Sequence, residues 1–259
     1  MTKYFLLLFL TVSSICMQAQ QERRMETDRP DQTESPVITR KNYVQSEWGF
    51  NIEKENGLKT FVHPTILWKY GISKRFELRL ITEFISQETP IIIPYGNDVI
   101  SGLLPVQIGG KVAFWEEKGL IPKTSVIFHV APSKLGSKKF HANKWAPDFV
   151  FTMQHTLSEK VGLGYNLGAA WDGESGTPYW VYTLAPGFNI GEKWYGYVEI
   201  FGAIRKNEIP QHNFDCGLAY YFSDNTKIDI SSGFGLSDAA TDWYGAIGFS
   251  FRLNTSRKK

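Results

Sequence analysis

The sequence is poor in cysteine. It has two, Cys16 and Cys216, and Cys16 lies in an N-terminal segment with the features of a cleaved signal. The mature chain would then keep one thiol, which excludes an internal disulfide. A small secreted domain often depends on such crosslinks, whereas a chain of 259 residues can bury a sizeable core without them.

Long apolar runs and blocks of one charge are also missing. After the N-terminal segment, no stretch reaches the roughly 17 to 25 apolar residues that a membrane-spanning helix needs. The 28 basic and 26 acidic side chains nearly balance, and no basic run occurs before the tail at 257–259. The sequence therefore predicts no transmembrane helix, and we expect no nucleic-acid partner.

The N-terminus has the order of a secretory signal. Lys3 supplies a positive charge, "YFLLLFLTV" (4–12) is an apolar core, and the small and polar residues that follow offer a cut near Ala19. Cys16 leaves a lipoprotein signal as an alternative, although Ile15 stands where a lipobox requires Gly, Ala or Ser. We predict a signal peptide over residues 1–19 and an exported mature chain.

The remainder alternates with a period of two. In "KIDISSGFGL" (227–236), Ile228, Ile230 and Phe234 share one face, and polar residues and glycines share the other. This is the pattern of a half-buried strand, and 15% aromatics with 23 glycines agree with an all-β fold. Twelve segments show it, near 43–53, 59–70, 75–87, 103–115, 123–131, 146–157, 161–172, 179–190, 194–204, 212–222, 226–237 and 242–253.

The connections decide between a soluble β-sandwich and a membrane barrel, since both alternate. Every second connection is short, such as "GISK" (71–74), whereas "ETPIIIPYGNDVISG" (88–102) and "PSKLGSKKFHANK" (132–144) are longer. Short turns at one end and long loops at the other are typical of outer-membrane barrels. We predict an all-β, antiparallel up-and-down transmembrane barrel of about 12 strands over residues 43–253, followed by a tail at 254–259.

The two strand faces have distinct roles in a barrel. The apolar face would contact lipid, with Leu78 and Phe234 near mid-depth and tryptophans at the headgroup level. The polar face would line the lumen, where the glycines of "GLGYNLG" (162–168) leave space. Its charges either line a water-filled path or neutralise each other as a polar core, and the sequence leaves both open. The inward charges are Glu47, Glu53, Glu77, Arg79, Glu83, Lys111, Asp148, Asp172, Glu199, Asp215, Lys227, Asp229 and Arg252.

Five stretches carry a family resemblance. They are "ETDRPDQTESP" (26–36), "LWKYGISKRFELRL" (67–80), "GLLPVQIGGKVAF" (102–114), "GLGYNLG" (162–168) and "IDISSGFGL" (228–236). The chain resembles the outer-membrane transporter family labelled for the meta-cleavage pathway of phenol degradation, from Glu26 to about Phe251. The resemblance implies an outer-membrane barrel that passes small molecules, with aromatic ones as candidates. It implies no catalytic residues.

Signals for catalysis and metal binding are absent from the sequence. It contains no His-x-His and no His-Glu-x-x-His motif, so we predict no metal site and no cofactor. A lipid hydrolase on a barrel wall would need a serine, a histidine and an orienting partner together. We predict that the protein is not an enzyme and keep such a hydrolase only as a second alternative function. No His-x-Ser pair is formed by the five histidines, His63, His129, His141, His155 and His212.

The leader between the signal peptide and the first strand, residues 20–42, can form neither core nor strand. Its two prolines lack N–H donors, and its charges prevent it from crossing lipid. It would lie in the periplasm as a plain tether, or thread into the barrel as a gate held against wall residues such as Glu83, Lys111 and Arg252. The charged candidates for that gate are Asp28, Arg29, Asp31 and Glu34.

These features predict a transporter or channel in the outer membrane of a Gram-negative bacterium, for passive passage of a small solute. A non-conducting barrel with a structural or surface-binding role, using the basic loop at 132–144, is the first alternative. We expect outer-membrane lipid, a small solute and, during biogenesis, the barrel-assembly machinery as partners. The identity of the solute and the oligomeric state do not follow from the sequence.

Overall fold

The computed structural model describes residues 24–89 and 98–256. The predicted signal peptide, residues 1–19, lies outside the described residues. The described chain forms the following elements: β1 (Tyr43–Glu55), β2 (Leu58–Gly71), β3 (Phe76–Thr89), β4 (Asp98–Leu103), β5 (Gln107–Trp115), β6 (Lys123–Ala131), the 3-10 helix η1 (Lys138–Phe140), β7 (Ala146–Thr156), β8 (Val161–Ala170), β9 (Tyr179–Ile190), β10 (Trp194–Ile204), β11 (Gln211–Ser223), β12 (Thr226–Gly235) and β13 (Trp243–Asn254).

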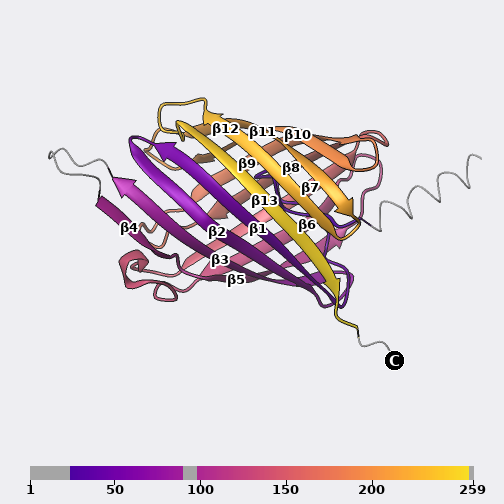
Figure 1. The fold of residues 1–259 in the computed structure, drawn as a ribbon, viewed down its shortest axis with the longest axis horizontal. Coiled ribbons are helices and arrows are strands. Elements are labelled where there is room, and N and C mark those ends of the chain that lie inside the picture. Colours follow the sequence, from indigo (N-terminus) through magenta and orange to yellow (C-terminus); the bar gives the residue numbers. More distant parts are fainter. Residues whose placement is uncertain (1–23, 90–97, 257–259) are drawn as a thin grey trace, which may run out of the picture.

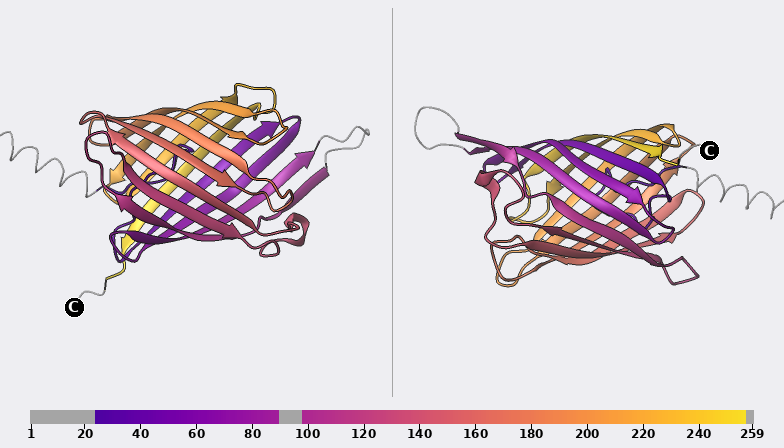
Figure 2. Two further views of the ribbon diagram at one scale, coloured as in Figure 1. Left: turned by 180° about the vertical axis from the view of Figure 1, so that it is seen from behind. Right: turned by 90° about the horizontal axis from the view of Figure 1, so that it is seen from below.

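The strands close into one antiparallel barrel (Figure 1, Figure 2). Apart from β4 and β5, strands that follow each other in sequence pair, and β1 pairs with β13 from Tyr43↔Asn254 to Lys54↔Trp243. Both β4 and β5 pair with β3, so thirteen strands fill twelve positions in the wall. Closure pairs the backbone groups of the first and last strands, as hydrocarbon surroundings require. The predicted all-β barrel of about twelve strands is confirmed.

The fourth wall position departs from the sequence prediction. The pattern predicts a long loop at 88–102 and one strand at 103–115, but β3 continues to Thr89 and β4 already begins at Asp98. The adjacent apolar residues Val99–Ile100 interrupt the alternation, so a period of two is not visible there. The described part of the predicted loop, residues 88–89 and 98–102, is thus strand.

The same position also contains a break between β4 and β5. Pro105 lies in it and cannot donate a hydrogen bond to a neighbouring strand. The loop after β6 bridges the break. Val106 N donates to Leu135 O at 2.7 Å, and Leu103 N donates to Ser137 Oγ at 2.9 Å. The long loop therefore completes the wall.

The barrel has a short-turn end and a long-loop end. The turns at 72–75, 191–193 and 224–225 lie at the short-turn end, together with the start of β1 and the end of β13. The connections at 132–145 and 171–178 lie at the long-loop end. This asymmetry is the one that the sequence predicts.

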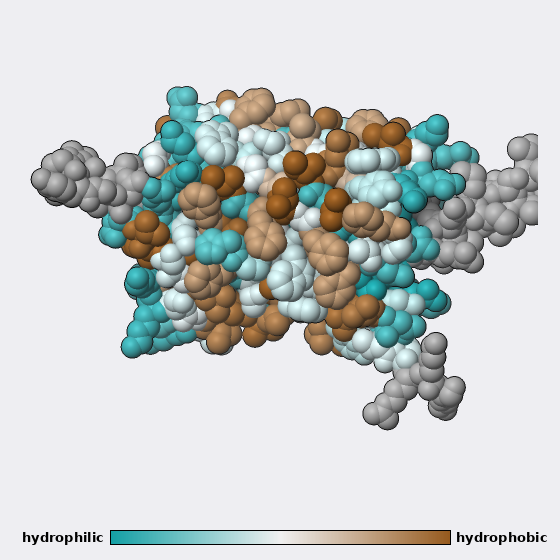
Figure 3. Space-filling model, in the orientation of Figure 1, coloured by the Kyte–Doolittle hydropathy of each residue, from teal (hydrophilic) through white to brown (hydrophobic). Residues whose placement is uncertain are grey.

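The wall is apolar outside and polar inside. The outward Leu78 and Ile230 are 46% and 57% exposed, whereas the adjacent inward Glu77 and Asp229 are 0% and 5% exposed. Figure 3 shows apolar side chains over the middle of the barrel and hydrophilic ones toward both ends. Such a belt suits hydrocarbon surroundings. Separately, no helix among the described residues is long and apolar enough to cross a membrane.

Arginine on this belt is expected to destabilise the barrel according to depth. Ile230 is the fifth residue of β12, so Ile230→Arg should lower the free energy of unfolding by roughly 2–4 kcal/mol, as for a charge at the bilayer midplane. Leu78 and Phe234 lie nearer strand ends than the sequence pattern suggests, as the third residue of β3 and the ninth of β12. Leu78→Arg should therefore cost about 1 kcal/mol or less. A urea titration in lipid vesicles compares the variants, and equal costs would contradict these depths.

Candidate functional site

The leader lies inside the barrel, where it is seen in indigo in Figure 1. It enters at the short-turn end, where Met25 N donates to Asp224 O at 2.8 Å and the Met25 side chain packs on Ala219 and Tyr221. It returns to the same end, where Lys41 forms a parallel bridge with Gly71. We call residues 25–39 the plug. The structure thus places this segment in the lumen and not outside the barrel as a free tether.

Asp28 is the centre of the plug's contacts with the wall. Its carboxylate lies 2.9 Å from Lys69 Nζ, 2.8 Å from Arg79 Nη1 and 3.2 Å from Lys111 Nζ, and it also accepts a hydrogen bond from Ser35 N at 3.0 Å. Burial alone would raise the pKa of Asp28, but the charges of Lys111, Lys69 and Arg79 hold that pKa well below its usual range. One leader carboxylate therefore bridges cations from β2, β3 and β5, and these cations also pair with Glu47 and Glu77 of the wall.

Glutamates of the wall fix the backbone of the plug. Glu47 Oε2 accepts hydrogen bonds from Asp28 N at 2.9 Å and Arg29 N at 3.2 Å. Glu199 Oε2 accepts from Gln32 N at 2.7 Å, and Glu77 binds the plug near its exit in the same way, through a backbone N–H of the leader. Backbone groups without a strand partner are thereby satisfied, as buried N–H groups must be.

Other leader charges are also held. Arg29 Nη2 lies 3.1 Å from Asp229 Oδ1, and Glu34 Oε2 lies 2.6 Å from Arg79 Nη2. Asp31 differs, because none of the described cations lies within ion-pair distance of it. Burial raises the pKa of Asp31 to about 8, although the charge of Lys227 acts against this rise. The plug is thus held by ion pairs at Asp28, Arg29 and Glu34.

His129 links the plug layer to the long-loop half of the lumen. Arg79 Nε donates to His129 Nε2 at 3.0 Å, and His129 Nδ1 lies 3.0 Å from Asp148 Oδ1. An arginine N–H can only donate, so Nε2 carries the lone pair and Nδ1 carries the proton that it donates to Asp148. The imidazole is therefore neutral, and the charge of Asp148 is not cancelled by a cation.

Most of the predicted inward residues lie on the inner face of the wall, and Asp172 is the exception. Strand β8 ends at Ala170, and Asp172 lies in the following loop, where Arg205 Nη2 is 2.7 Å from its Oδ2. The predicted inward position fails there because β8 ends at Ala170, whereas the alternating sequence pattern continues for two more residues. The residues that do face inward are Glu47, Glu53, Glu77, Arg79, Glu83, Lys111, Asp148, Glu199, Asp215, Lys227, Asp229 and Arg252.

The three wall residues expected near the leader lie at different levels of the barrel. Lys111 holds Asp28, as expected. Glu83 faces the lumen nearer the long-loop end and takes part in none of the described ion pairs with the leader. Arg252 lies at the short-turn end, where its Nε donates to Asn225 Oδ1 at 2.9 Å. The role of all these residues in transport stays a prediction.

Sequence reasoning missed Lys69 and Tyr197. A bulge between Val62 and Thr65 shifts the parity of β2. Counting the alternation from the start of the strand therefore places Lys69 on the wrong face. Counting back from the short turn at 72–75 would have placed it inward. Tyr197 donates to Asp215 Oδ2 at 3.1 Å, and its position two residues before Glu199 was the available signal.

A cavity of about 90 Å³ lies between the plug and the wall formed by β8 and β9. Gly162, Gly164 and Gly187 line one side, and Thr33 and Pro36 of the plug line the other. A Cβ at Gly164 would come within 2.9 Å of Thr33 Cγ2. The inward glycines of "GLGYNLG" thus leave space beside the plug.

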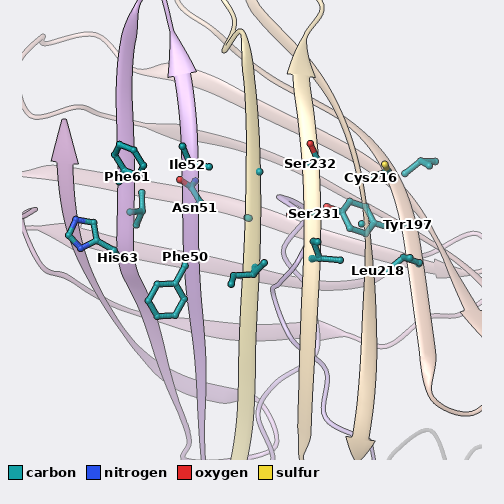
Figure 4. A pocket seen from close by; sticks show the side chains of 18 of the residues that line it. Phe50, Asn51, Ile52, Phe61, His63, Tyr197, Cys216, Leu218, Ser231 and Ser232 are labelled. Atoms are coloured by element: carbon teal, nitrogen blue, oxygen red, sulfur yellow. The ribbon is translucent and has the colours of Figure 1, made fainter. Parts of the chain in front are cut away.

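A larger hollow, of about 1210 Å³, lies on the outer surface (Figure 4). Its floor is made by the small outward residues Cys216, Ser232 and Gly245, which are direct cross-strand neighbours on β11, β12 and β13. Leu218 and Phe50 rise beside them. The outward side chains that line this hollow face the lipid side of the wall. Among residues 24–89 and 98–256, no group of three His, Cys, Asp or Glu is placed to hold a metal ion.

Comparison with known proteins agrees with this architecture. The family described as "Putative MetA-pathway of phenol degradation" matches residues 27–253. A search of the curated proteins found no match. Among solved structures, an outer membrane channel from Pseudomonas putida F1 is similar, with a TM-score of 0.67 at 10% identity over 88% of this chain and 100% of that one.

Two further solved structures share the fold. The KdgM porin in complex with disordered oligogalacturonate has a TM-score of 0.54 at 8% identity, over 79% of this chain and 98% of that one. The CymD monoaromatic hydrocarbon channel has a TM-score of 0.50 at 9% identity, over 83% of this chain and 89% of that one. At these identities the likeness shows the fold, which is that of outer-membrane channels and porins.

Proposed function

We propose, from the premise that this chain belongs to the family of the MetA pathway of phenol degradation, that it is a passive channel for small solutes. The barrel lies in the outer membrane, with the short-turn end in the periplasm. Aromatic molecules are the candidate solutes, which the family description and the name of the monoaromatic hydrocarbon channel support. The protein acts without catalysis, and its partners are outer-membrane lipid, the solute and, during biogenesis, the barrel-assembly machinery.

The observation that carries this proposal is the kind of contact that holds the plug. The plug is held by ion pairs and by backbone hydrogen bonds to wall carboxylates. A cavity lined by glycines already lies beside it. Water and ions can replace such polar contacts, so the plug can move or a solute can pass along it.

Gly162→Leu is expected to lower the conductance of the purified protein in a planar bilayer. A Cβ at Gly162 meets only Gln154 Nε2 at 3.6 Å and His155 O at 3.7 Å, so the backbone tolerates the change and the added side chain occupies the cavity. Gly245→Leu is the matched control, because a Cβ there has nothing within 4 Å and would fill the outer hollow instead. Wild-type protein that folds but carries no current, or passes no solute into vesicles, would overturn the channel function.

A further inference from the structure

The cations of the lumen are already paired. Lys69, Arg79 and Lys111 bind Asp28 of the plug. Lys227 Nζ lies 3.9 Å from Asp229 Oδ2, and the same aspartate binds the plug's Arg29. These basic residues therefore present little free charge to a solute in the lumen, because an acid cancels each of them at close range.

The long-loop half of the lumen, in contrast, carries acids from three sectors of the wall. Glu53 on β1, Glu83 on β3 and Asp148 on β7 face inward there. Among the described residues, no lysine or arginine lies within ion-pair distance of them, and the partner of Asp148 is the neutral His129 imidazole. No described strand residue that faces inward in this half is basic. The lysines of the 132–145 loop are exposed at the rim, where salt screens them.

The acidic lining continues into the plug layer. Glu199 and Asp215 are direct cross-strand neighbours on β10 and β11. Asp215 is 0% exposed, yet its Oδ1 lacks a hydrogen-bond donor among the described residues. A buried carboxylate oxygen without a donor is costly unless water or a cation satisfies it. The acidic lining therefore extends from the long-loop half to this cross-strand pair.

We propose that the long-loop half of the lumen is a cation-selecting vestibule, and that the channel favours cationic or uncharged solutes over anionic ones. The inference rests on the proposed channel function and names the charge class of its solute. Uncancelled charges of one sign in a narrow lumen with low-dielectric walls concentrate counter-ions and repel ions of the same sign. An aromatic solute would accordingly enter as a neutral molecule or an amine rather than as a carboxylic acid.

The reversal potential of the full-length protein in a planar bilayer with a KCl gradient tests this inference. We expect the sign that indicates permeation of K⁺ over Cl⁻. Benzylammonium should also permeate better than benzoate, a probe pair with the same ring and opposite charge. A reversal potential near zero, or of the opposite sign, would overturn the inference while leaving the channel function intact. Absence of any current would overturn both.

Variants locate the selectivity in the vestibule. Glu53→Gln combined with Glu83→Gln should bring the reversal potential toward zero, since neither side chain takes part in a described ion pair and the plug is not disturbed. Glu192→Gln, in the exposed turn at 191–193, removes the same charge away from the lumen and should leave the potential unchanged. If the double variant does not show heat-modifiable gel migration, Asp148→Asn replaces it. Cation selectivity that persists in a folded vestibule variant contradicts the assignment to these residues.

Discussion

Asp28→Asn is expected to release the plug and raise the single-channel conductance. The substitution leaves Lys69, Arg79 and Lys111 buried without the carboxylate that all three contact. Removing one partner from a buried charge network typically costs roughly 3–5 kcal/mol. Since about 1.4 kcal/mol corresponds to a factor of ten, the bound state of the plug should become at least about a hundredfold less favoured. Single-channel recording measures the change as more frequent or longer open events.

Asp31→Asn is the matched control for this prediction, because it makes the same chemical change three residues away. The pKa of Asp31 is about 8 when the plug is in place, against about 3.9 for a free aspartate. Asp31 must therefore take up a proton to enter the lumen, and this requirement weakens plug binding progressively as the pH rises from about 4 to about 8. Asparagine removes the requirement. At pH 7 the plug of Asp31→Asn should be bound at least as tightly as that of the wild type. Equal increases in single-channel conductance in Asp28→Asn and Asp31→Asn would contradict the roles assigned to the two carboxyls.

Deletion of residues 25–36 is expected to raise the conductance more than Asp28→Asn does. The deletion removes the leader carboxylates and the backbone groups that Glu47 and Glu199 hold, but it leaves every strand in place. The barrel should still migrate anomalously on gels when unheated, and its conductance should rise severalfold above the wild-type level. High salt should reproduce part of the rise in the wild type, because screening weakens partly exposed ion pairs. Unchanged current in a folded deletion variant would reduce the leader to a linker.

The wall of the barrel could be predicted from the sequence because its periodicity is local. "KIDISSGFGL" assigns Ile230 to the outside and Asp229 to the inside without any knowledge of neighbouring strands, and the structure agrees. Predictions failed where local periodicity is interrupted. The bulge in β2 changes which residues face inward, so the pattern did not identify Lys69. Adjacent apolar residues interrupt the alternation at the start of β4, and the alternation continues past the end of β8 at Ala170, so Asp172 was wrongly assigned to a strand.

The site could be predicted only in outline. The charges and prolines of the leader indicate a segment that cannot form a strand, and they nominate Asp28 among four residues. Which wall cations it meets depends on strand register, barrel closure and the path of the leader, which join residues 41 to 83 positions apart for Lys69, Arg79 and Lys111. No short sequence pattern encodes such contacts. Which charges of the lumen are paired and which are not can be determined only when these contacts are known.

A displaceable plug should control passage through the barrel, and a reversible tether between plug and wall tests this most directly. Thr33 Oγ1 of the plug lies 2.6 Å from Thr183 Oγ1 of β9, close enough for a disulfide between cysteines at these positions. Thr33→Cys and Thr183→Cys would be combined with Cys216→Ser, to remove the free thiol on β11, and with Asp28→Asn. We expect low conductance under oxidising conditions and the high Asp28→Asn conductance after reduction. High conductance with the disulfide fully formed would contradict it.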